Sequence, residues 1–235
     1  MKKTKAASMP RNNRLPSSES GNVFMFILLG VVLFGALAFV ISRGFRSDTT
    51  AAMSDRKAEL LAVDVLAYAQ RLERAVGKMQ QKGVSESDIS FDNTVDTGYG
   101  HTPDEPVEHD VFNAAGGGVN RQNPPSGAND NSAWHFTGGT CIADIGKGTT
   151  GCDTNTFSDE ELIAVLPNVN PAVCEVIDKK LGIGSIPENT GNAYSATKFT
   201  GAFADGSEII LDASHSAACY SDGTDYHFYY VLIAR

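Results

Sequence analysis

The run from Val23 to Ile41 constrains this chain more than any other part of the sequence, because it holds no charged and no strongly polar side chain. As a helix that rises 1.5 Å per residue, a run of about nineteen residues would measure roughly 28 Å. The apolar interior of a bilayer is about 30 Å thick. The sequence therefore predicts a transmembrane helix over residues 22–43.

The charges around this run predict its orientation. Residues 1–21 form a basic leader, in which Glu19 stands alone against Lys2, Lys3, Lys5, Arg11 and Arg14. Basic residues collect on the cytoplasmic side of a membrane span, so we expect a cytoplasmic N-terminus. The whole chain has a net charge of -9, and its remainder is therefore strongly acidic. Because nucleic-acid binding needs cations that neutralise phosphates, we do not expect that function.

A cleaved signal peptide is an alternative interpretation of the same run. The leader is basic, and Ala36-Leu37-Ala38 has the small-x-small form of a cleavage site. The apolar run nevertheless continues through Phe39, Val40 and Ile41 beyond that site. This continuation favours a retained helix over a discarded one.

A second helical pattern follows the apolar run. After a break at residues 42–44, residues 44–83 are predicted to form an amphipathic helix that ends at Gly83. Its apolar residues recur at spacings of three and four and form one stripe: Leu61, Val65, Tyr68, Leu72, Ala75 and Met79. The stripe could pack on the chain's own domain or form a coiled coil, and both remain open at this point.

All four cysteines follow the apolar run. An even number of cysteines in an exported segment predicts disulfides, and four cysteines allow three pairings. We favour Cys141–Cys152, which closes a short glycine-rich loop, and Cys174–Cys219, which ties a helix to a late loop. A zinc site is less favoured because the chain lacks a C-x-x-C spacing. Four free thiols would be expected if the domain were cytosolic.

The remainder predicts a loop-rich linker over residues 84–133 and an exported α+β domain over residues 134–235. Its expected helices begin at Ser158 and at Asn170. Its expected strands lie at residues 132–141, 193–203, 207–213 and 225–234, with an Asp-Gly hairpin between the second and third. Residues 214–224, which include Cys219, are expected to be a loop. The predicted fold class is thus α+β, with the long N-terminal helix packed on a C-terminal antiparallel sheet.

The order of these features resembles the type IV pilin and pseudopilin superfamily: a basic leader, Gly21, an apolar helix, an amphipathic continuation and a glycine-rich domain with cysteines. The stretch "SGNVFMFILLG" is also similar to the leaders of Tad-type pilus proteins. The resemblance implies that a prepilin peptidase cuts between Gly21 and Asn22. It also implies that the apolar helices bundle into a filament core, for which the assembly residues would be Phe24, Phe26, Leu29, Leu33 and Leu37.

Two positions depart from that family's pattern. The first mature residue would be Asn22, where the family has a bulky apolar residue, and the fifth would be Phe26, where it has Glu. These departures favour a minor pilin or pseudopilin of a type IV pilus, type II secretion or Tad-like system. Its expected partners are other pilin-like subunits, the prepilin peptidase and an inner-membrane assembly platform.

The same resemblance implies a location and leaves one alternative function. We expect a bacterial inner-membrane protein whose C-terminal domain lies in the periplasm, or outside the cell within a pilus. The alternative is a single-pass inner-membrane protein with a periplasmic binding or sensing domain that never polymerises.

No catalytic constellation emerges from the polar residues, so we expect no enzyme and no cofactor. The five histidines do not form a metalloprotease motif. The segment "HTPDEPVEHD" brings His101 and His109 among acidic residues, which could hold a metal but favours a solvated acidic loop. The turn "SDGTD" makes Asp222 and Asp225 calcium candidates, against the simpler interpretation of ordinary turn chemistry.

Overall fold

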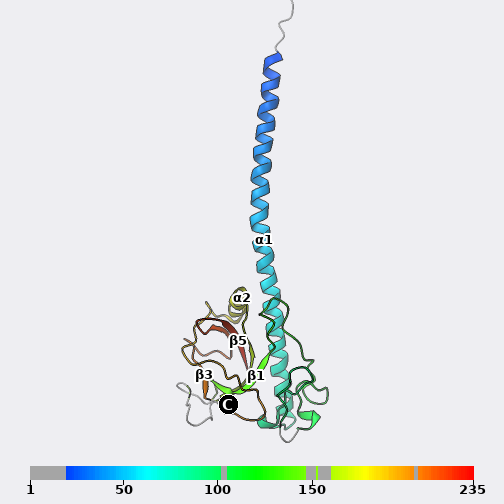
Figure 1. Cartoon of the computed structure of the whole chain (residues 1–235), viewed down its shortest axis with the longest axis vertical. Coiled ribbons are helices and arrows are strands. Elements are labelled where there is room, and N and C mark those ends of the chain that lie inside the picture. Colours follow the sequence, from blue (N-terminus) through cyan, green and yellow to red (C-terminus); the bar gives the residue numbers. More distant parts are fainter. Residues whose placement is uncertain (1–19, 102–104, 147–151, 153–159, 204–205) are drawn as a thin grey trace, which may run out of the picture. The chain divides into compact units, whose positions relative to one another are not determined.

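The computed structural model describes residues 20–101, 105–146, 152, 160–203 and 206–235 (Figure 1). Within its first helix, side chains are described for residues 23–38 and from residue 54 onward. The chain divides into two compact units, Met1–Ala52 and Met53–Arg235, and each is treated by itself below.

Helix α1 spans Ser20–Gln81, and its backbone is helical at residues 42–44, where a break was expected. Among the described residues, no helix combines the length and the apolar character that crossing a bilayer requires. The prediction of a transmembrane helix over residues 22–43 is therefore corrected.

In the second unit, α1 buries the predicted stripe against its own domain. Val65, Leu72 and Met79 are fully buried, and Tyr68 packs against Trp134 with ring centroids 5.4 Å apart. Small residues such as Ala62 and Ala69 are also fully buried, which widens the stripe. Of the two interpretations left open by the sequence, packing on the chain's own domain is therefore correct for these residues.

One glycine, Gly83, terminates helix α1. Gly83 adopts a φ of +93°, a left-handed conformation that L side chains rarely adopt. The next amide, of Val84, donates to the carbonyl of Met79 at 3.2 Å. This geometry closes the helix where the sequence predicted its end.

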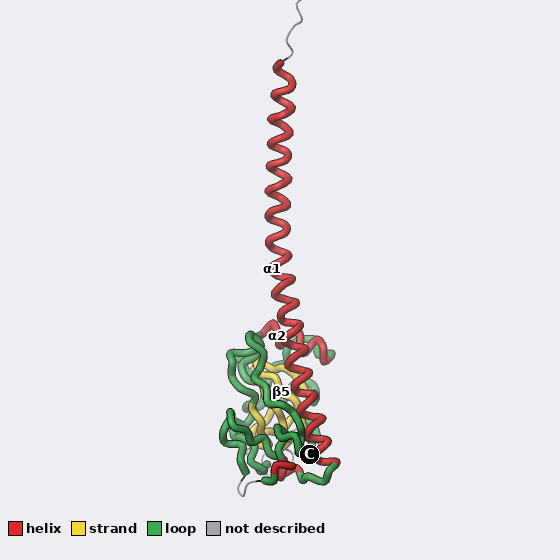
Figure 2. Tube along the Cα trace, turned by 90° about the vertical axis from the view of Figure 1, so that its right-hand side faces the viewer, coloured by secondary structure: helices red, strands yellow, loops and turns green. Residues whose placement is uncertain are grey.

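Among the described residues, a five-stranded sheet forms the centre of the second unit, in the order β3-β1-β2-β5-β4. The strands are β1 (His135–Ile142), β2 (Glu160–Leu166), β3 (Ser207–Ile209), β4 (Ala217–Ser221) and β5 (Tyr226–Ile233). Figure 2 shows the second part of α1 running beside these strands. Three of the strand pairs are antiparallel, but β3 lies parallel to β1. The sheet is thus mixed, and the prediction of an antiparallel sheet is wrong.

The two faces of the sheet bury different sets of side chains. Along β2, Leu162, Ala164 and Leu166 face the core shared with α1, whereas Ile163 and Val165 face the opposite core. Alternation of this kind is expected of a strand whose two faces are both buried. Segments between α2 and β4 cover the second face, and they contribute Ile183, Tyr194 and Leu211.

Three of the sequence-based assignments are corrected in this sheet. The helix expected from Ser158 is strand β2 over its described part, and the loop expected at residues 214–224 contains strand β4. The segment 193–203 forms no strand, so the hairpin expected between it and β3 does not form in the described residues.

Helix α2 (Pro171–Leu181) forms where the sequence predicted it. The Asn170 side chain accepts a hydrogen bond from the Ala172 amide at 3.0 Å, and Pro171 occupies the first turn. Gly182, with a φ of +82°, ends the helix. Val173, Cys174 and Ile177 are buried against the sheet on the same face as α1.

The described part of the expected linker, residues 84–133, contains two short 3-10 helices, η1 (Glu86–Asp88) and η2 (Val107–His109). Its apolar residues Ile89, Phe91, Tyr99 and Val111 belong to the main core. The ring of Phe91 stacks on that of Phe136 in β1 at 4.2 Å. This segment is therefore an integral layer of the domain despite its polar, glycine-rich composition.

The segment 187–190 joins the two edges of the sheet. At the β4 edge, the amide of Asn189 donates to the carbonyl of Ser221, and the Ser221 amide donates to the carbonyl of Pro187. At the other edge, just beyond β3, the Thr190 amide donates to the carbonyl of Ile210. The sheet is therefore curled, with one short segment bonded to both of its ends.

Candidate functional site

The first unit presents an apolar helical surface, residues 23–38 of α1. Every described side chain in this run is exposed. The predicted assembly residues all belong to it, with exposed fractions of 70% for Phe24, 67% for Phe26, 57% for Leu29, 62% for Leu33 and 58% for Leu37. A helix that is apolar on all sides is normally covered by other apolar groups. Residues 23–38 are therefore a candidate interaction surface, and we call them the apolar segment.

The predicted processing site lies beside the apolar segment. Gly21 and Asn22 fall in the first turn of α1, and the Asn22 side chain lies outside those that the structure describes. The geometry of this pair therefore provides no test of cleavage, which stays a prediction. Phe26, at the position where the resembled family has Glu, is exposed like its neighbours.

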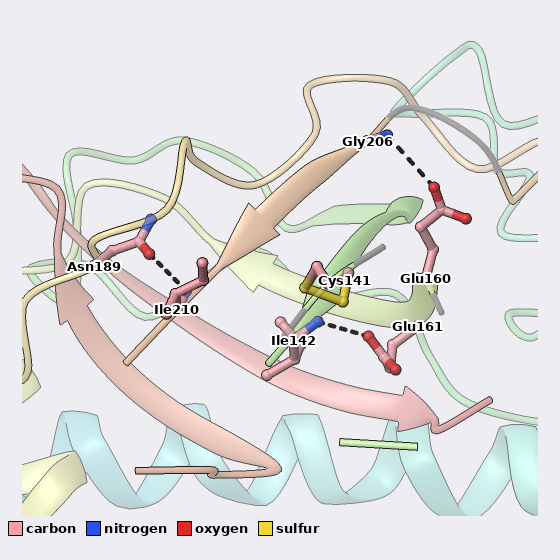
Figure 3. Close-up of a disulfide and its surroundings, with 8 residues drawn as sticks. Cys141, Ile142, Glu160, Glu161, Asn189, Gly206 and Ile210 are labelled. Atoms are coloured by element: carbon pink, nitrogen blue, oxygen red, sulfur yellow. Dashed lines mark hydrogen bonds between the residues drawn. A yellow bond between two sulfur atoms is a disulfide. The ribbon is translucent and has the colours of Figure 1, made fainter. Parts of the chain in front are cut away.

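The first predicted disulfide, Cys141–Cys152, is present, with Cα atoms 5.8 Å apart (Figure 3). It starts in β1 beside two acidic residues of β2, Glu160 and Glu161, which are nearly or fully buried. The amide of Ile142 donates to Glu161 Oε2 at 2.7 Å, and the amide of Gly206 donates to Glu160 Oε1 at 3.4 Å. These carboxylates therefore help to hold β1, β2 and the start of β3 together.

The second predicted disulfide, Cys174–Cys219, is also present and ties α2 to β4. Asp178, one helical turn after Cys174, accepts a hydrogen bond from the Cys219 amide at 2.8 Å. Its other oxygen, Oδ2, is buried without a hydrogen-bond partner among the described residues. Burial raises the pKa of Asp178 to about 7, against the lowering effect of that amide hydrogen bond.

The calcium candidates lie in a tight turn whose contacts are internal. Asp222 Oδ1 accepts hydrogen bonds from the amides of Thr224 and Asp225 at 2.9 and 2.8 Å. Asp222 Oδ2 accepts a hydrogen bond from His227 Nε2 at 3.1 Å. These contacts agree with turn chemistry for Asp222, and calcium binding by Asp222 and Asp225 stays a prediction.

Two histidines and two carboxylates meet in a different place. His109 Nδ1 lies 2.6 Å from Glu105 Oε2, and His101 Nδ1 lies 3.8 Å from Glu105 Oε1. Asp88 completes a group with Glu105 and His109 whose possible ligand atoms all lie within 4.8 Å of one another. The sequence pointed to His101, Glu105 and His109, but it did not point to Asp88, which belongs to a separate segment.

Two of the remaining histidines have structural partners. His135 Nε2 donates to the carbonyl of Ser195 at 3.0 Å, and burial lowers the pKa of His135. His227 Nδ1 accepts from the amide of Asn168 at 3.3 Å, which leaves Nε2 to donate to Asp222. Hydrogen bonds of this kind orient the rings within the fold. They do not arrange a nucleophile and a base, and the expectation that the chain is no enzyme stays a prediction.

A broad groove of about 700 Å³ lies at the end of α2, lined by residues that include Glu175, Lys179, Ile183, Glu188 and Tyr226. No histidine or cysteine is among the described residues that line it.

Comparisons with protein-family models, with curated proteins and with solved structures gave no match to this chain. Its candidate function must therefore be argued from the chain's own surfaces.

Proposed function

We propose that this protein is a structural subunit of a pilus-like filament, of the minor pilin or pseudopilin kind, that assembles through its N-terminal helix. The observation that supports the proposal is the apolar segment of α1, in which large apolar side chains are exposed on every side. Fully burying one such side chain contributes about 1.5–3 kcal/mol. The occupant that we propose for this surface is the same segment of other copies of the chain.

The sequence of the apolar segment supports packing of helix against helix. Gly30 and Gly35 leave open space beside their Cα atoms, where an added methyl group would meet no atom within 4 Å. Small residues of this kind let a second backbone approach closely. Large residues on the remaining positions would then interdigitate with those of the neighbouring helix. A repeated contact between non-identical faces extends into a helical filament when the rotation between successive copies does not close a ring.

The disulfides support the proposed location of the second unit. Disulfides persist in oxidising compartments and are rare in the cytosol. We propose that residues 53–235 are exported to the bacterial periplasm or to the outside of the cell. In this proposal the peptidase cut between Gly21 and Asn22 precedes assembly, and other pilin-like subunits are the partners.

Photo-crosslinking of the full chain in its native host tests the proposal. A photoreactive phenylalanine analogue at Phe26 should yield a ladder of subunit oligomers, whereas the same group at Val95, an exposed apolar residue of the second unit, should not. Leu33→Asp should reduce the ladder at least tenfold, because it places a charge in the contact. Leu60→Asp is the matched control: Leu60 is 68% exposed and Leu33 is 62% exposed, and both belong to α1.

Two results would overturn the proposal. One is a crosslink at Phe26 that joins the chain only to lipid or to unrelated proteins. The other is an equal loss of oligomers in Leu33→Asp and Leu60→Asp. Either result, with a monomeric chain, would favour a non-polymerising binding domain, for which the groove beside α2 is the place to look.

A further inference from the structure

We propose that Asp88, Glu105 and His109 form a binding site for a divalent transition-metal ion, with Zn²⁺ as the probe. The site lies wholly in the second unit and shares no residue with the apolar segment. The three side chains are half-buried, and their candidate ligand atoms lie within 4.8 Å of one another. A metal ion would draw them closer, since Zn²⁺ binds nitrogen and oxygen ligands at about 2.0–2.2 Å.

The backbone holds the two segments of this site side by side. The Ser90 amide donates to the carbonyl of His109, and the Val111 amide donates to the carbonyl of Ser90, both at 2.9 Å. Ile89 and Val111, which flank these bonds, are fully buried. These bonds therefore hold the backbone at His109 next to the segment that carries Asp88.

A buried histidine, His101, lies beside Glu105 and also supports the proposed metal site. Its side chain is 5% exposed, and its Nε2 has no hydrogen-bond partner among the described residues. Its Nδ1 faces Glu105 Oε1 at 3.8 Å, which is longer than a hydrogen bond. Glu105 thus turns Oε2 toward His109 and Oε1 toward His101. If Oε2 bound a metal, His101 could donate to Oε1 and orient the carboxylate, which makes His101 a positioning residue.

The chemical types of the three ligand side chains indicate which class of metal ion the site would prefer. One imidazole nitrogen and two carboxylates are the kinds of ligand that Zn²⁺ takes at sites with an open position. Calcium prefers six to eight oxygen ligands, whereas this group offers one imidazole nitrogen and two carboxylates. We therefore expect Zn²⁺ to bind and Ca²⁺ to bind far more weakly.

The test is a calorimetric titration of the full chain, freed of metal with a chelator and with both disulfides intact. Zn²⁺ should bind with a stoichiometry of one per chain. His109→Ala and Glu105→Gln should each weaken binding at least tenfold. His215→Ala is the matched control, because His215 is also half-buried and lies outside the group. Circular dichroism of each metal-free variant checks that its fold is unchanged.

The visible spectrum of bound Co²⁺ distinguishes a metal ligand from a residue that only orients a ligand. We expect His101→Gln to weaken binding about tenfold while leaving the visible spectrum of bound Co²⁺ unchanged, whereas His109→Ala should change that spectrum. The proposal fails if Zn²⁺ shows no saturable binding at micromolar concentrations. It also fails if His109→Ala, Glu105→Gln and His215→Ala lose equal affinity, which would indicate adventitious binding only.

Discussion

Asp178 is a carboxyl group that lies almost completely buried beside the Cys174–Cys219 disulfide. Because burial raises its pKa to about 7 from an ordinary 3.8, the folded chain holds this proton more tightly than the unfolded chain. Its contribution to stability is therefore fully present below about pH 4 and is lost as the pH rises through 7. The slope for one proton reaches about 1.4 kcal/mol per pH unit.

We therefore predict that Asp178→Asn flattens the pH dependence of stability between pH 4 and 7. Urea unfolding across that range measures the free energy of unfolding of the variant and of the wild type. Asp225→Asn, at an exposed position, should leave the wild-type profile unchanged. Identical profiles for Asp178→Asn and the wild type would show that Asp178 is already ionised at low pH in the folded chain.

A second prediction at the residue scale concerns Gly21. In a host with a prepilin peptidase, we expect the intact mass of the protein to correspond to a chain that begins at Asn22. Gly21→Leu should preserve the full-length mass, because a large side chain would block a cut after a small residue. Gly30→Leu, a matched change in the same helix, should still be cut. A full-length wild-type product in such a host would exclude this processing.

Single residues also show the limits of sequence reasoning at the candidate metal site. Glu105 and His109 are only four positions apart, so their proximity in the fold could be expected from the sequence. Asp88 joins them only because Ser90 pairs with Asp110 across a separation that no local pattern encodes. Glu160 and Glu161 are similar: acidic side chains are rarely buried, yet backbone amides from distant segments compensate for the burial of these two.

At the scale of the element, the second part of α1 carries much of the main core. We predict that Leu72→Ala lowers the free energy of unfolding by about 2–5 kcal/mol, since Leu72 is fully buried there. Leu60→Ala, on the same helix at an exposed position, should change it by less than about 0.5 kcal/mol. Chemical unfolding followed by circular dichroism measures both. Equal effects would mean that α1 does not pack as described.

The elements differ in how well the sequence predicts them. Helix α2 carries its own start and stop signals, Asn170, Pro171 and Gly182, so its bounds follow from local chemistry. Strand β2 has no such signals within it, and a short apolar run can be a buried helix or a buried strand. Its neighbours on both sides, β1 and β5, decide the outcome, because they supply the hydrogen bonds of a central strand.

At the scale of the molecule, the two disulfides close loops of different length. The chain-entropy model assigns about 4 kcal/mol to Cys174–Cys219, which spans 45 residues, and about 3 kcal/mol to Cys141–Cys152, which spans 11. We predict that the paired change Cys174→Ala and Cys219→Ala destabilises the protein more than Cys141→Ala and Cys152→Ala. Thermal unfolding of the two double variants measures the difference. The reverse order would indicate that strain or residual structure dominates.

The order and direction of the strands in the whole sheet could not be predicted from the sequence. The cysteine pairing was predicted correctly because loop length and position limited the choices. The parallel pair of β1 and β3 was not, because β2, α2 and a further segment without helix or strand separate these two strands in the chain. An Asp-Gly turn predicted a hairpin that would pair β3 with the segment before it, whereas β3 joins the sheet beside β1, on the side away from β2.

The segment 187–190 affects whether the edges of the sheet can associate with other molecules. Exposed strand edges are templates on which other chains can add as extra strands, which leads to aggregation. Here Pro187 and Asn189 bond to Ser221 at one edge, and Thr190 bonds to Ile210 beyond the other. Strand β3 is also very short, with three residues. The domain is thus protected against joining other molecules edge to edge. A crowded array of such domains could remain soluble while contacts form elsewhere on the chain.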